Sequence, residues 1–323
     1  MQQTNENMKP SYVSKPEREI KEFIENNGFE CETNNRKALK GKEMDIYVPS
    51  LRLGIEYNGN FWHREGMNHK TKNTHLEKTL AARENGVKLI QIFEDEYVLH
   101  REIVYQKISH LLGISKNLEK ISGRKCVIKE ITKSEAEPFL ENNHIQGYAY
   151  STVHLGAFYN ERLVGVMLFF KDEKNNDVWT LTRFASDIHT ICRGVGGKLF
   201  SYFLNKYKPA KIKSFADRRW TIDEENNLYI KLGFNFDGYT YPSYTYYNSK
   251  IDKVRRFHKF GFRKQLLHKK YGLPLTMTEK EMTEALGYRR IWDCGLIRYV
   301  YINSCTNENF ERSIKKETIN ENN

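Results

Sequence analysis

Two carboxylates are the first candidates for chemistry, because each lies in a short apolar run where an unpaired charge would be costly. Asp45 lies in the run 44–48 and Glu56 in the run 53–57, with a Pro-Ser turn between the runs. Such runs predict two strands of a hairpin, across which the carboxylates meet. A hard cation suits this pair, since Mg²⁺ is bound by one or two carboxylates while it keeps waters and phosphate oxygens. The pair therefore predicts a magnesium site, with one or two ions.

The stretch from Ser14 to Leu112 resembles the very-short-patch-repair (Vsr) endonucleases of the PD-(D/E)XK superfamily, and in particular the EDxHD homing endonucleases. Asp45, Glu56 and the run Phe61-Trp62-His63 carry the likeness. The resemblance implies an α/β nuclease core and a catalytic set of Glu17, Asp45, Glu56 and His63, with the metal on Asp45 and Glu56. It also implies an intracellular protein, with a phage-encoded origin as one option.

Two features depart from that family. Asn58 stands where the wider superfamily has a lysine, and the helix after the motif offers His75 and Glu77 in place of a final acid. His63 is expected to take over the role of base, with an orienting partner that the motif does not name. His69 and His75 are expected to be solvated.

Glu17 has a structural alternative to catalysis. The run Ser14-Lys15-Pro16-Glu17 reads as a capping box ahead of a helix from Arg18 to Asn27, which Gly28 ends. Both a catalytic and a capping role are open for this side chain.

The chemistry that these residues predict is phosphodiester hydrolysis. A metal on Asp45 and Glu56 would orient a water and neutralise the scissile phosphate, while His63 moves a proton near neutral pH. In the repair enzymes that the motif resembles, aromatic residues wedge into the DNA stack, and such insertion kinks a duplex. Phe61 and Trp62 are therefore predicted to contact DNA, with filling of the core beside the site as the alternative.

The composition favours a polyanionic partner. The chain has 52 Lys and Arg against 41 Asp and Glu, a formal charge of +11, which suits nucleic acid better than an acidic protein surface. Its five cysteines form no Cys-x-x-Cys pair, which fits a reducing cytoplasm. No apolar run reaches membrane-spanning length and residues 1–14 lack a secretory core, so a soluble, cytoplasmic protein is expected.

At 323 residues the chain is predicted to hold two α/β domains. The nuclease domain is predicted over residues 14–113, a linker over 114–125 and a second domain over 126–303. The polar ends at residues 1–13 and 304–323 are expected to be disordered.

The second domain is expected to run strand, helix, hairpin, strand, helix, strand, with a hairpin turn at Asn160-Glu161. Within it, the loop Gly194-Val195-Gly196-Gly197 opens a helix, and glycines at a helix start can cradle phosphate. With Tyr229 in the run Asn227 to Phe234, this order resembles the GNAT acetyltransferases over residues 126–245.

The GNAT resemblance implies an acetyl-CoA pyrophosphate site on Gly194, Gly196 and Gly197, with Tyr229 as the acid for the leaving thiolate. Ile191 replaces the usual Gln or Arg ahead of the loop, and no general base can be assigned. A GNAT-like scaffold that positions DNA is therefore preferred to an active transferase.

The basic stretch 253–270 also favours DNA. If this stretch is helical, Arg255, Lys259 and Arg263 share one face at a spacing of four, which suits phosphate contacts. The alternative is a solvated helix face. The residues predicted to contact DNA here are Arg255, Arg256, Lys259, Arg263 and Lys264.

The sequence thus predicts a Mg²⁺-dependent endonuclease of the homing type that cuts double-stranded DNA and carries a GNAT-like, DNA-contacting domain. The alternatives are a mismatch-repair nickase, an acetyl-CoA-dependent transferase with a nuclease-like targeting domain, and a non-catalytic DNA-binding protein. No pattern in the chain sets an oligomeric state.

Overall fold

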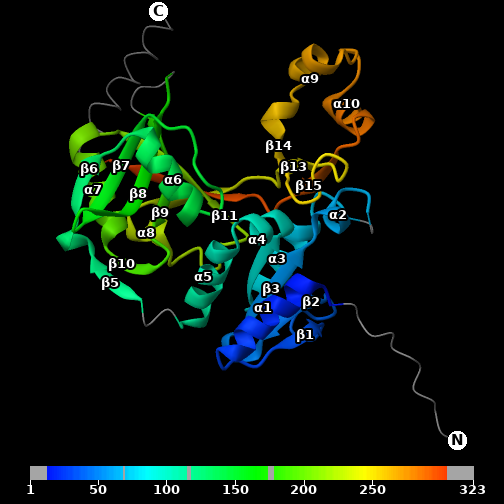
Figure 1. The fold of residues 1–323 in the computed structure, drawn as a ribbon, viewed down its shortest axis with the longest axis horizontal. Helices are drawn as coiled ribbons and strands as arrows, with labels where there is room; N and C mark the ends of the chain where they lie inside the picture. Colours follow the sequence, from blue (N-terminus) through cyan, green and yellow to red (C-terminus); the bar gives the residue numbers. More distant parts are fainter. Residues whose placement is uncertain (1–12, 68–69, 115–117, 174–177, 304–323) are drawn as a thin grey trace, which may run out of the picture. The chain divides into compact units, whose positions relative to one another are not determined.

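A computed structural model describes residues 13–67, 70–114, 118–173 and 178–303, so the predicted tails, apart from residue 13, lie outside the described ranges. The chain folds into two compact units (Figure 1). Unit 1 comprises Met1–Leu99 and Pro242–Cys294, and unit 2 comprises His100–Tyr241 and Gly295–Asn323. Both units are mixed α/β, as the sequence predicts. Among the described helices, none is long and apolar enough to cross a membrane.

The amino-terminal part of unit 1 has the predicted order of helix, strands, helix, strand. The sheet order is β1-β2-β3-β4, with β3 and β4 parallel and the other neighbours antiparallel. The elements are α1 (Lys15–Asn26), β1 (Glu32–Asn35), β2 (Met44–Val48), η1 (Pro49–Leu51), β3 (Leu53–Asn58), α2 (Asn60–His63), α3 (Thr74–Glu84), β4 (Lys88–Phe93) and α4 (Glu94–Leu99).

Side chains along β2 point alternately to the two faces of the strand, and this alternation decides which of them reach the candidate site. Residues 44, 46 and 48 are buried in the core, so Asp45 points to the opposite face of the strand. The whole of β3 is buried, and the register that pairs Ile46 with Ile55 brings Asp45 beside Glu56. The hairpin therefore forms the carboxylate pair that the sequence predicts.

Residues 242–294 belong to unit 1, whereas the sequence predicts one continuous second domain over 126–303. We call residues 242–294 the insert, because they interrupt unit 2 between two paired strands, β12 (Asn235–Tyr239) and β16 (Leu296–Ile302). Its three-stranded sheet has the order β14-β13-β15. The elements of the insert are β13 (Tyr244–Tyr247), β14 (Phe257–His258), η4 (Lys259–Phe262), α9 (Lys264–Tyr271), α10 (Glu279–Ala285) and β15 (Arg289–Trp292).

Contacts that no local pattern encodes hold the insert in unit 1. Arg256 pairs with Asp95 at 2.7 Å and with Glu96 at 3.3 Å. Its guanidinium carbon lies 3.8 Å from the centre of the Phe93 ring, and the insert buries that ring further with Tyr247 and Ile291. These pairs join residues more than 150 positions apart, so the domain boundary could not be predicted from composition along the chain.

The basic helix predicted across residues 255–263 is not formed. Residues 257–258 are a strand, residues 259–262 are a 3-10 turn, and α9 begins only at Lys264. Phe257 and Phe262 turn into the small core of the insert, and this packing overrides the helical spacing. Arg255, Lys259 and Arg263 therefore share no helical face.

Replacing Arg256 by Ala is expected to destabilise unit 1 by about 3–5 kcal/mol, because it leaves two partly buried carboxylates without this cation. The Arg256 side chain is 11% exposed, so solvent screens these pairs little. The neighbouring substitution Arg255→Ala is the matched control, since that side chain is 64% exposed, and it should change stability by less than about 0.5 kcal/mol. Urea unfolding of both variants measures the difference, and equal midpoints would contradict the structural role of Arg256.

Unit 2 is built on a seven-stranded sheet of order β12-β16-β11-β9-β8-β7-β6, in which β9 and β11 are the parallel neighbours. Asn160 and Glu161 form the predicted hairpin turn, both with positive φ. The other elements of unit 2 are α5 (Arg101–Leu112), β5 (Glu119–Ser122), η3 (Gly123–Lys125), β6 (Val127–Glu130), α6 (Lys133–Asn143), β7 (Val153–Tyr159), β8 (Arg162–Lys171), β9 (Val178–Ser186), β10 (Thr190–Arg193), α7 (Val195–Tyr207), β11 (Lys211–Asp217) and α8 (Leu228–Lys231).

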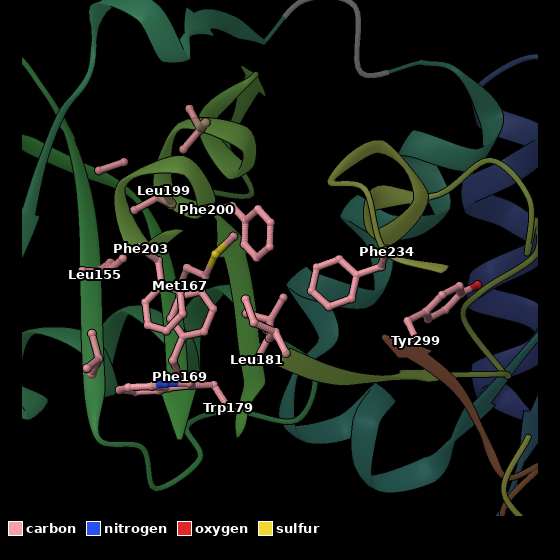
Figure 2. Close-up of a cluster of buried hydrophobic side chains, with 14 of the residues drawn as sticks. Leu155, Met167, Phe169, Trp179, Leu181, Leu199, Phe200, Phe203, Phe234 and Tyr299 are labelled. Atoms are coloured by element: carbon pink, nitrogen blue, oxygen red, sulfur yellow. The ribbon is translucent and has the colours of Figure 1, made fainter. Parts of the chain in front are cut away.

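Helix α7 packs against the sheet of unit 2 through aromatic side chains (Figure 2). Phe203 of α7 stacks on Phe169 of β8 with the ring centres 3.5 Å apart, and it meets Trp179 of β9 edge to face. Leu199 and Phe200 extend the same face of the helix into the core. This packing fixes the start of α7, where the predicted glycine loop lies.

Two predicted boundaries between the domains differ from the structure. Residues 119–122 of the predicted linker form β5, which pairs in parallel with β10, and the 3-10 turn η3 follows. Helix α5, predicted as part of the nuclease domain, belongs to unit 2. Polar composition suggested a linker, but backbone pairing with β10 gives the segment a fixed structure.

Candidate functional site

In the carboxylate pair of unit 1, Glu56 is buried and Asp45 is half-buried, and backbone hydrogen bonds tie the two together. The amide of Asp45 donates to Oε1 of Glu56 at 3.2 Å, and the amide of Tyr57 donates to Oδ2 of Asp45 at 2.8 Å. Burial, and next the charge of Glu56, raise the pKa of Asp45 well above its usual value. Burial likewise raises the pKa of Glu56. Two such groups repel each other when ionised, which is the condition under which a cation binds.

Two lysines face this pair, and the sequence analysis did not identify them. Lys78 of α3 forms an ion pair with Oε2 of Glu56. Burial and the charge of Lys78 lower the pKa of Lys70, while Glu56 and Asp45 act on it in the opposite direction. Lys78 could have been predicted from the sequence, because it lies three positions after His75 and so on the same face of the helix.

Asn58, at the position where the superfamily has a lysine, is structural. Its side chain is 1% exposed and donates to Oε1 of Gln91 at 3.4 Å. Nε2 of Gln91 in turn donates to the backbone oxygen of His75 at 2.8 Å and to the hydroxyl of Thr79 at 2.7 Å. This amide chain anchors α3 to the sheet, and Lys78 of α3 supplies the cation instead.

His63 is oriented by His75, which the sequence analysis expected to be solvated. Nδ1 of His63 lies 2.8 Å from Nε2 of His75, and Nδ1 of His75 lies 2.7 Å from the backbone oxygen of Trp292. His75 is only 5% exposed, so the expectation of a solvated side chain was wrong. Its partner Trp292 lies in the insert, which explains why the sequence did not indicate the contact. The other histidine in question, His69, lies outside the described residues.

These contacts determine the tautomers of both rings. A carbonyl oxygen only accepts, so Nδ1 of His75 must carry the proton, and Nε2 of neutral His75 is an acceptor. Nδ1 of His63 must then donate, which leaves Nε2 of His63 as a lone pair. Burial, and next the electrostatic influence of the neighbouring His75 ring, hold the pKa of His63 well below its usual value. His63 is thus a neutral base at neutral pH.

Glu17 forms the capping box that was one of its two predicted roles. The hydroxyl of Ser14 donates to Oε1 of Glu17 at 2.7 Å, and the amide of Glu17 donates back to that hydroxyl at 3.4 Å. The charge of Glu17 also contributes, as the smallest of several causes, to the raised pKa of Asp45. The carboxylate therefore lies within electrostatic range of the site but is held by the helix cap.

Phe61 and Trp62 lie at the surface, so the alternative that both fill the core is wrong. They are 37% and 57% exposed and meet edge to face with ring centres 5.0 Å apart. The guanidinium carbon of Arg64 lies 4.0 Å from the centre of the Phe61 ring. An exposed aromatic pair beside His63 is available for contact with a ligand.

The five basic residues predicted to bind DNA have unequal surroundings. Arg256 is engaged by Asp95 and Glu96 and is not available to phosphate, which corrects that prediction. Nζ of Lys259 donates to the hydroxyl of Ser243 at 2.8 Å. The others are Arg255, which is exposed, Arg263, which lies over the exposed ring of Phe260, and Lys264, which is half-buried.

The glycine loop of unit 2 opens α7 as predicted, and another part of the chain packs against one side of it while Gly194 stays exposed. Gly194 caps the helix with a φ of +75°. A Cβ placed on Gly123 would lie 2.5 Å from the carbonyl oxygen of Gly194, so η3 packs directly on the loop. Nζ of Lys198 donates to the carbonyl of Arg124 at 3.1 Å. Ile191, at the departure from the GNAT pattern, lies in β10 and pairs with β5.

A cavity of about 150 Å³ lies between β9 and β11 of unit 2, beyond the last paired residues of the two strands. Arg183, Trp220 and Tyr229 are among the residues that line it. Tyr229 stacks on Tyr299 with ring centres 4.8 Å apart, and burial raises its pKa. The tyrosine that the GNAT resemblance indicates is therefore an undissociated phenol in a small pocket.

Within the described parts of the chain, no group of three or more His, Cys, Asp or Glu is arranged to hold a metal ion. The carboxylate pair of unit 1 nevertheless fits Mg²⁺, which needs only one or two carboxylates beside waters and phosphate oxygens. Asp45 is the better ligand of the two, because Glu56 already engages both oxygens, one with the Asp45 amide and one with Lys78.

No family model and no curated protein matches this sequence. Solved structures similar to the chain include a Bacillus subtilis acetyltransferase in complex with CoA (15% identity, TM-score 0.32) and a GNAT family acetyltransferase from Elizabethkingia anophelis with acetyl-CoA bound (15% identity, TM-score 0.33); each match covers 55% of this chain and 99% of that chain. The ribosomal-protein-S18-alanine N-acetyltransferase from Escherichia coli matches at 12% identity and a TM-score of 0.32, over 55% of this chain and 93% of that one.

Such identities and TM-scores carry no argument about activity or cofactor. The element order of unit 2, with the glycine loop at the start of α7, agrees with the GNAT-like domain predicted from the sequence. The Vsr-like resemblance rests on the residues of unit 1.

Proposed function

We propose that unit 1 is a Mg²⁺-dependent endonuclease of the homing type that hydrolyses phosphodiester bonds in double-stranded DNA. The observation that carries the proposal is a carboxylate pair, buried at Glu56 and half-buried at Asp45, together with an oriented histidine on which the same two lysines act. Lys70 and Lys78 act electrostatically on both Asp45 and His63. Perturbed pKa values of this kind are common in active sites, which supports the proposal.

Each of these residues of unit 1 has a separate role in the proposed hydrolysis. Mg²⁺ bound to Asp45 and Glu56 would lower the pKa of a water and neutralise charge on the phosphate. Nε2 of His63 takes a proton from the attacking water as its oxygen bonds to phosphorus. Lys70 and Lys78 add positive charge where the pentacoordinate transition state at phosphorus accumulates negative charge. The leaving ester oxygen departs from phosphorus and takes a proton from solvent.

His75 and Trp292 have positioning roles in this proposal. The Trp292 carbonyl fixes the tautomer of His75, and His75 fixes that of His63. The lone pair of His63 therefore lies on Nε2, the ring nitrogen that does not contact His75. The insert would thus take part in the nuclease through its backbone. A chain ending near Gly123 lacks the insert and is expected to lose cleavage, although composition alone would place all of the chemistry before that residue.

Incubation of a supercoiled plasmid library with the full-length protein tests the proposal. Cleavage is expected with Mg²⁺ and is expected to stop when a chelator is added in excess, and sequencing of the new ends maps the recognition site. Nicked product alone, enhanced by a mismatch, would favour the repair nickase over the homing enzyme. Intact plasmid throughout, with a folded protein that binds the same DNA, would leave the non-catalytic DNA-binding protein as the better account.

An acetyl-CoA-dependent transferase is the second candidate, favoured by the cavity between β9 and β11 that holds Arg183 and Tyr229. The packing of Gly123 on Gly194 and the hydrogen bond from Lys198 to the Arg124 carbonyl count against it, because they engage one side of the loop. The other side is open to a cavity of about 670 Å³ that Gly194 and Lys198 line.

Acetyl-CoA is expected to leave the melting temperature unchanged, while Mg²⁺ with duplex DNA is expected to raise it. A ligand present at 100 times its Kd adds about 2.7 kcal/mol of stability, so either binding event is measurable by thermal denaturation. The desulfo analogue of CoA, which keeps the pyrophosphate, serves as the control. A rise with acetyl-CoA and none with Mg²⁺ and DNA would reverse the order of the two candidates.

A further inference from the structure

One cavity in unit 1 is not used by the proposed chemistry. It has a volume of about 390 Å³ and lies between the loop after α2 and two segments of the insert, the turn after β13 and the start of β15. Three of the residues that line it are cations, Arg64, Lys250 and Arg289, and one is an acid, Glu65. A cavity with this charge selects an anion.

The walls of the cavity are held by hydrogen bonds. The amide of Glu65 donates to the backbone oxygen of Arg290 at 2.7 Å, which joins the loop to β15. Nδ2 of Asn248 donates to the backbone oxygen of Leu286 at 3.0 Å, and its Oδ1 accepts from the amide of Lys250 at 3.0 Å. The backbone that carries the cations is therefore already ordered, which reduces the entropy lost when an anion binds.

The acid in the cavity does not cancel its charge. The carboxylate of Glu65 is 3.7 Å from Nζ of Lys280, a residue outside the cavity. The insert as a whole carries twelve Lys and Arg against five Asp and Glu, so most of the formal charge of +11 belongs to this one segment. The field around the cavity is thus positive, which attracts anions and favours a partner that carries many negative charges.

The cavity also adjoins the exposed aromatic pair. Arg64, one of its cations, directly follows α2 and lies against the ring of Phe61. An anion held by Arg64 would therefore lie close to Phe61 and Trp62, as a backbone phosphate does when neighbouring bases contact an aromatic side chain.

We propose that this cavity binds a backbone phosphate of duplex DNA and that the insert thereby positions the duplex on unit 1. The inference rests on the proposed nuclease function. It assigns the main phosphate contacts to Lys250 and Arg289, whereas the sequence predicts them in the stretch 253–270. Arg64 can form paired hydrogen bonds to phosphate oxygens, while Lys250 acts as a point charge. Nη1 of Arg289 already donates to the backbone oxygen of Tyr288 at 2.8 Å, so this guanidinium is held in place and would contact phosphate through its other nitrogens.

The test measures the salt dependence of DNA binding in the cleavage-silent Asp45→Asn protein. Adding Lys250→Gln and Arg289→Gln together is expected to weaken binding of a labelled duplex by about 10- to 100-fold near 0.1 M salt. The slope of log affinity against log salt should become shallower by about one to two units, since each phosphate contact contributes about 0.9. The pair Lys250→Arg and Arg289→Lys should keep most of the slope.

The matched control removes the same charges from unit 2, at exposed Lys120 and Arg162, through Lys120→Gln and Arg162→Gln. This control should leave the slope nearly unchanged, and all variants should unfold at similar temperatures. An unchanged slope in the folded Lys250→Gln, Arg289→Gln protein would overturn the phosphate cavity. Failure of the nuclease itself is a separate result, because it would appear as absence of cleavage by the wild-type chain with binding still measurable.

Discussion

Asp45→Asn is expected to reduce plasmid cleavage by about 10³-fold or more while duplex binding stays within several-fold. The metal supplies several kcal/mol to the transition state, and 1.36 kcal/mol corresponds to a factor of ten in rate. The substitution removes the ionisable ligand, but its amide oxygen can still accept from the Tyr57 amide that holds the present side chain at 2.8 Å. The strand pairing should therefore survive, and initial rates in a Mg²⁺ titration measure the loss.

The same variant makes a prediction about stability that is independent of activity. Because the pKa of Asp45 is raised in the folded state, its contribution to stability is present at low pH and is lost as the pH rises above the unfolded value of 3.8. Without metal at neutral pH, Asp45→Asn should therefore melt at a higher temperature than the wild type. Added Mg²⁺ should stabilise the wild type and not the variant.

Glu43→Gln is the control for these effects, since Glu43 precedes the same strand but pairs with the exposed Arg36. It should cleave and melt like the wild type. Normal cleavage by Asp45→Asn in Mg²⁺ would remove the carboxylate pair from the reaction.

His63→Ala is expected to lower kcat by about 10²- to 10⁴-fold, the usual contribution of a general base. Mg²⁺ affinity, measured by calorimetry, should be largely kept, because His63 is assigned proton transfer and no coordination. Loss of Mg²⁺ binding in this variant would make His63 a ligand and would require a different base.

The pH profile of the wild type provides a second readout for His63. A base must be unprotonated to act, and the pKa of His63 is held well below 6.5 by burial and by His75. The rate should therefore remain flat from about pH 8 down through 6.5 and fall only at lower pH. At saturating Mg²⁺, which keeps Asp45 ionised, a fall already at pH 7 would mean that His63 takes up a proton there despite its contact with His75.

His75 offers a way to separate positioning from proton transfer. His75→Ala removes the acceptor for Nδ1 of His63, and kcat should fall with little change in KM, although less than in His63→Ala. His75→Gln can replace the acceptor with its amide oxygen and is expected to recover part of the activity. Equal activity of His75→Ala and the wild type would show that the 2.8 Å contact has no catalytic role.

Much of the local structure was predictable from the sequence, because it depends on neighbours along the chain. Alternating apolar residues in 44–48 placed Asp45 on one face of a strand, and the Pro-Ser turn set the register that brings Glu56 beside it. The capping box at Ser14 and Glu17 and the turn at Asn160-Glu161 also formed as their residue types predict. Each of these features needs only a few consecutive side chains to be favourable.

The tertiary structure alone decided which distant residues complete the candidate site. The role of His75 depends on the Trp292 carbonyl, more than 200 positions away, and that contact exists because Arg256 binds Asp95 and Glu96 and places the insert in unit 1. The same ion pairs remove Arg256 from the residues available to DNA. Such contacts gain their energy from burial and from charges brought together in space, and no periodicity or motif along the chain records either quantity.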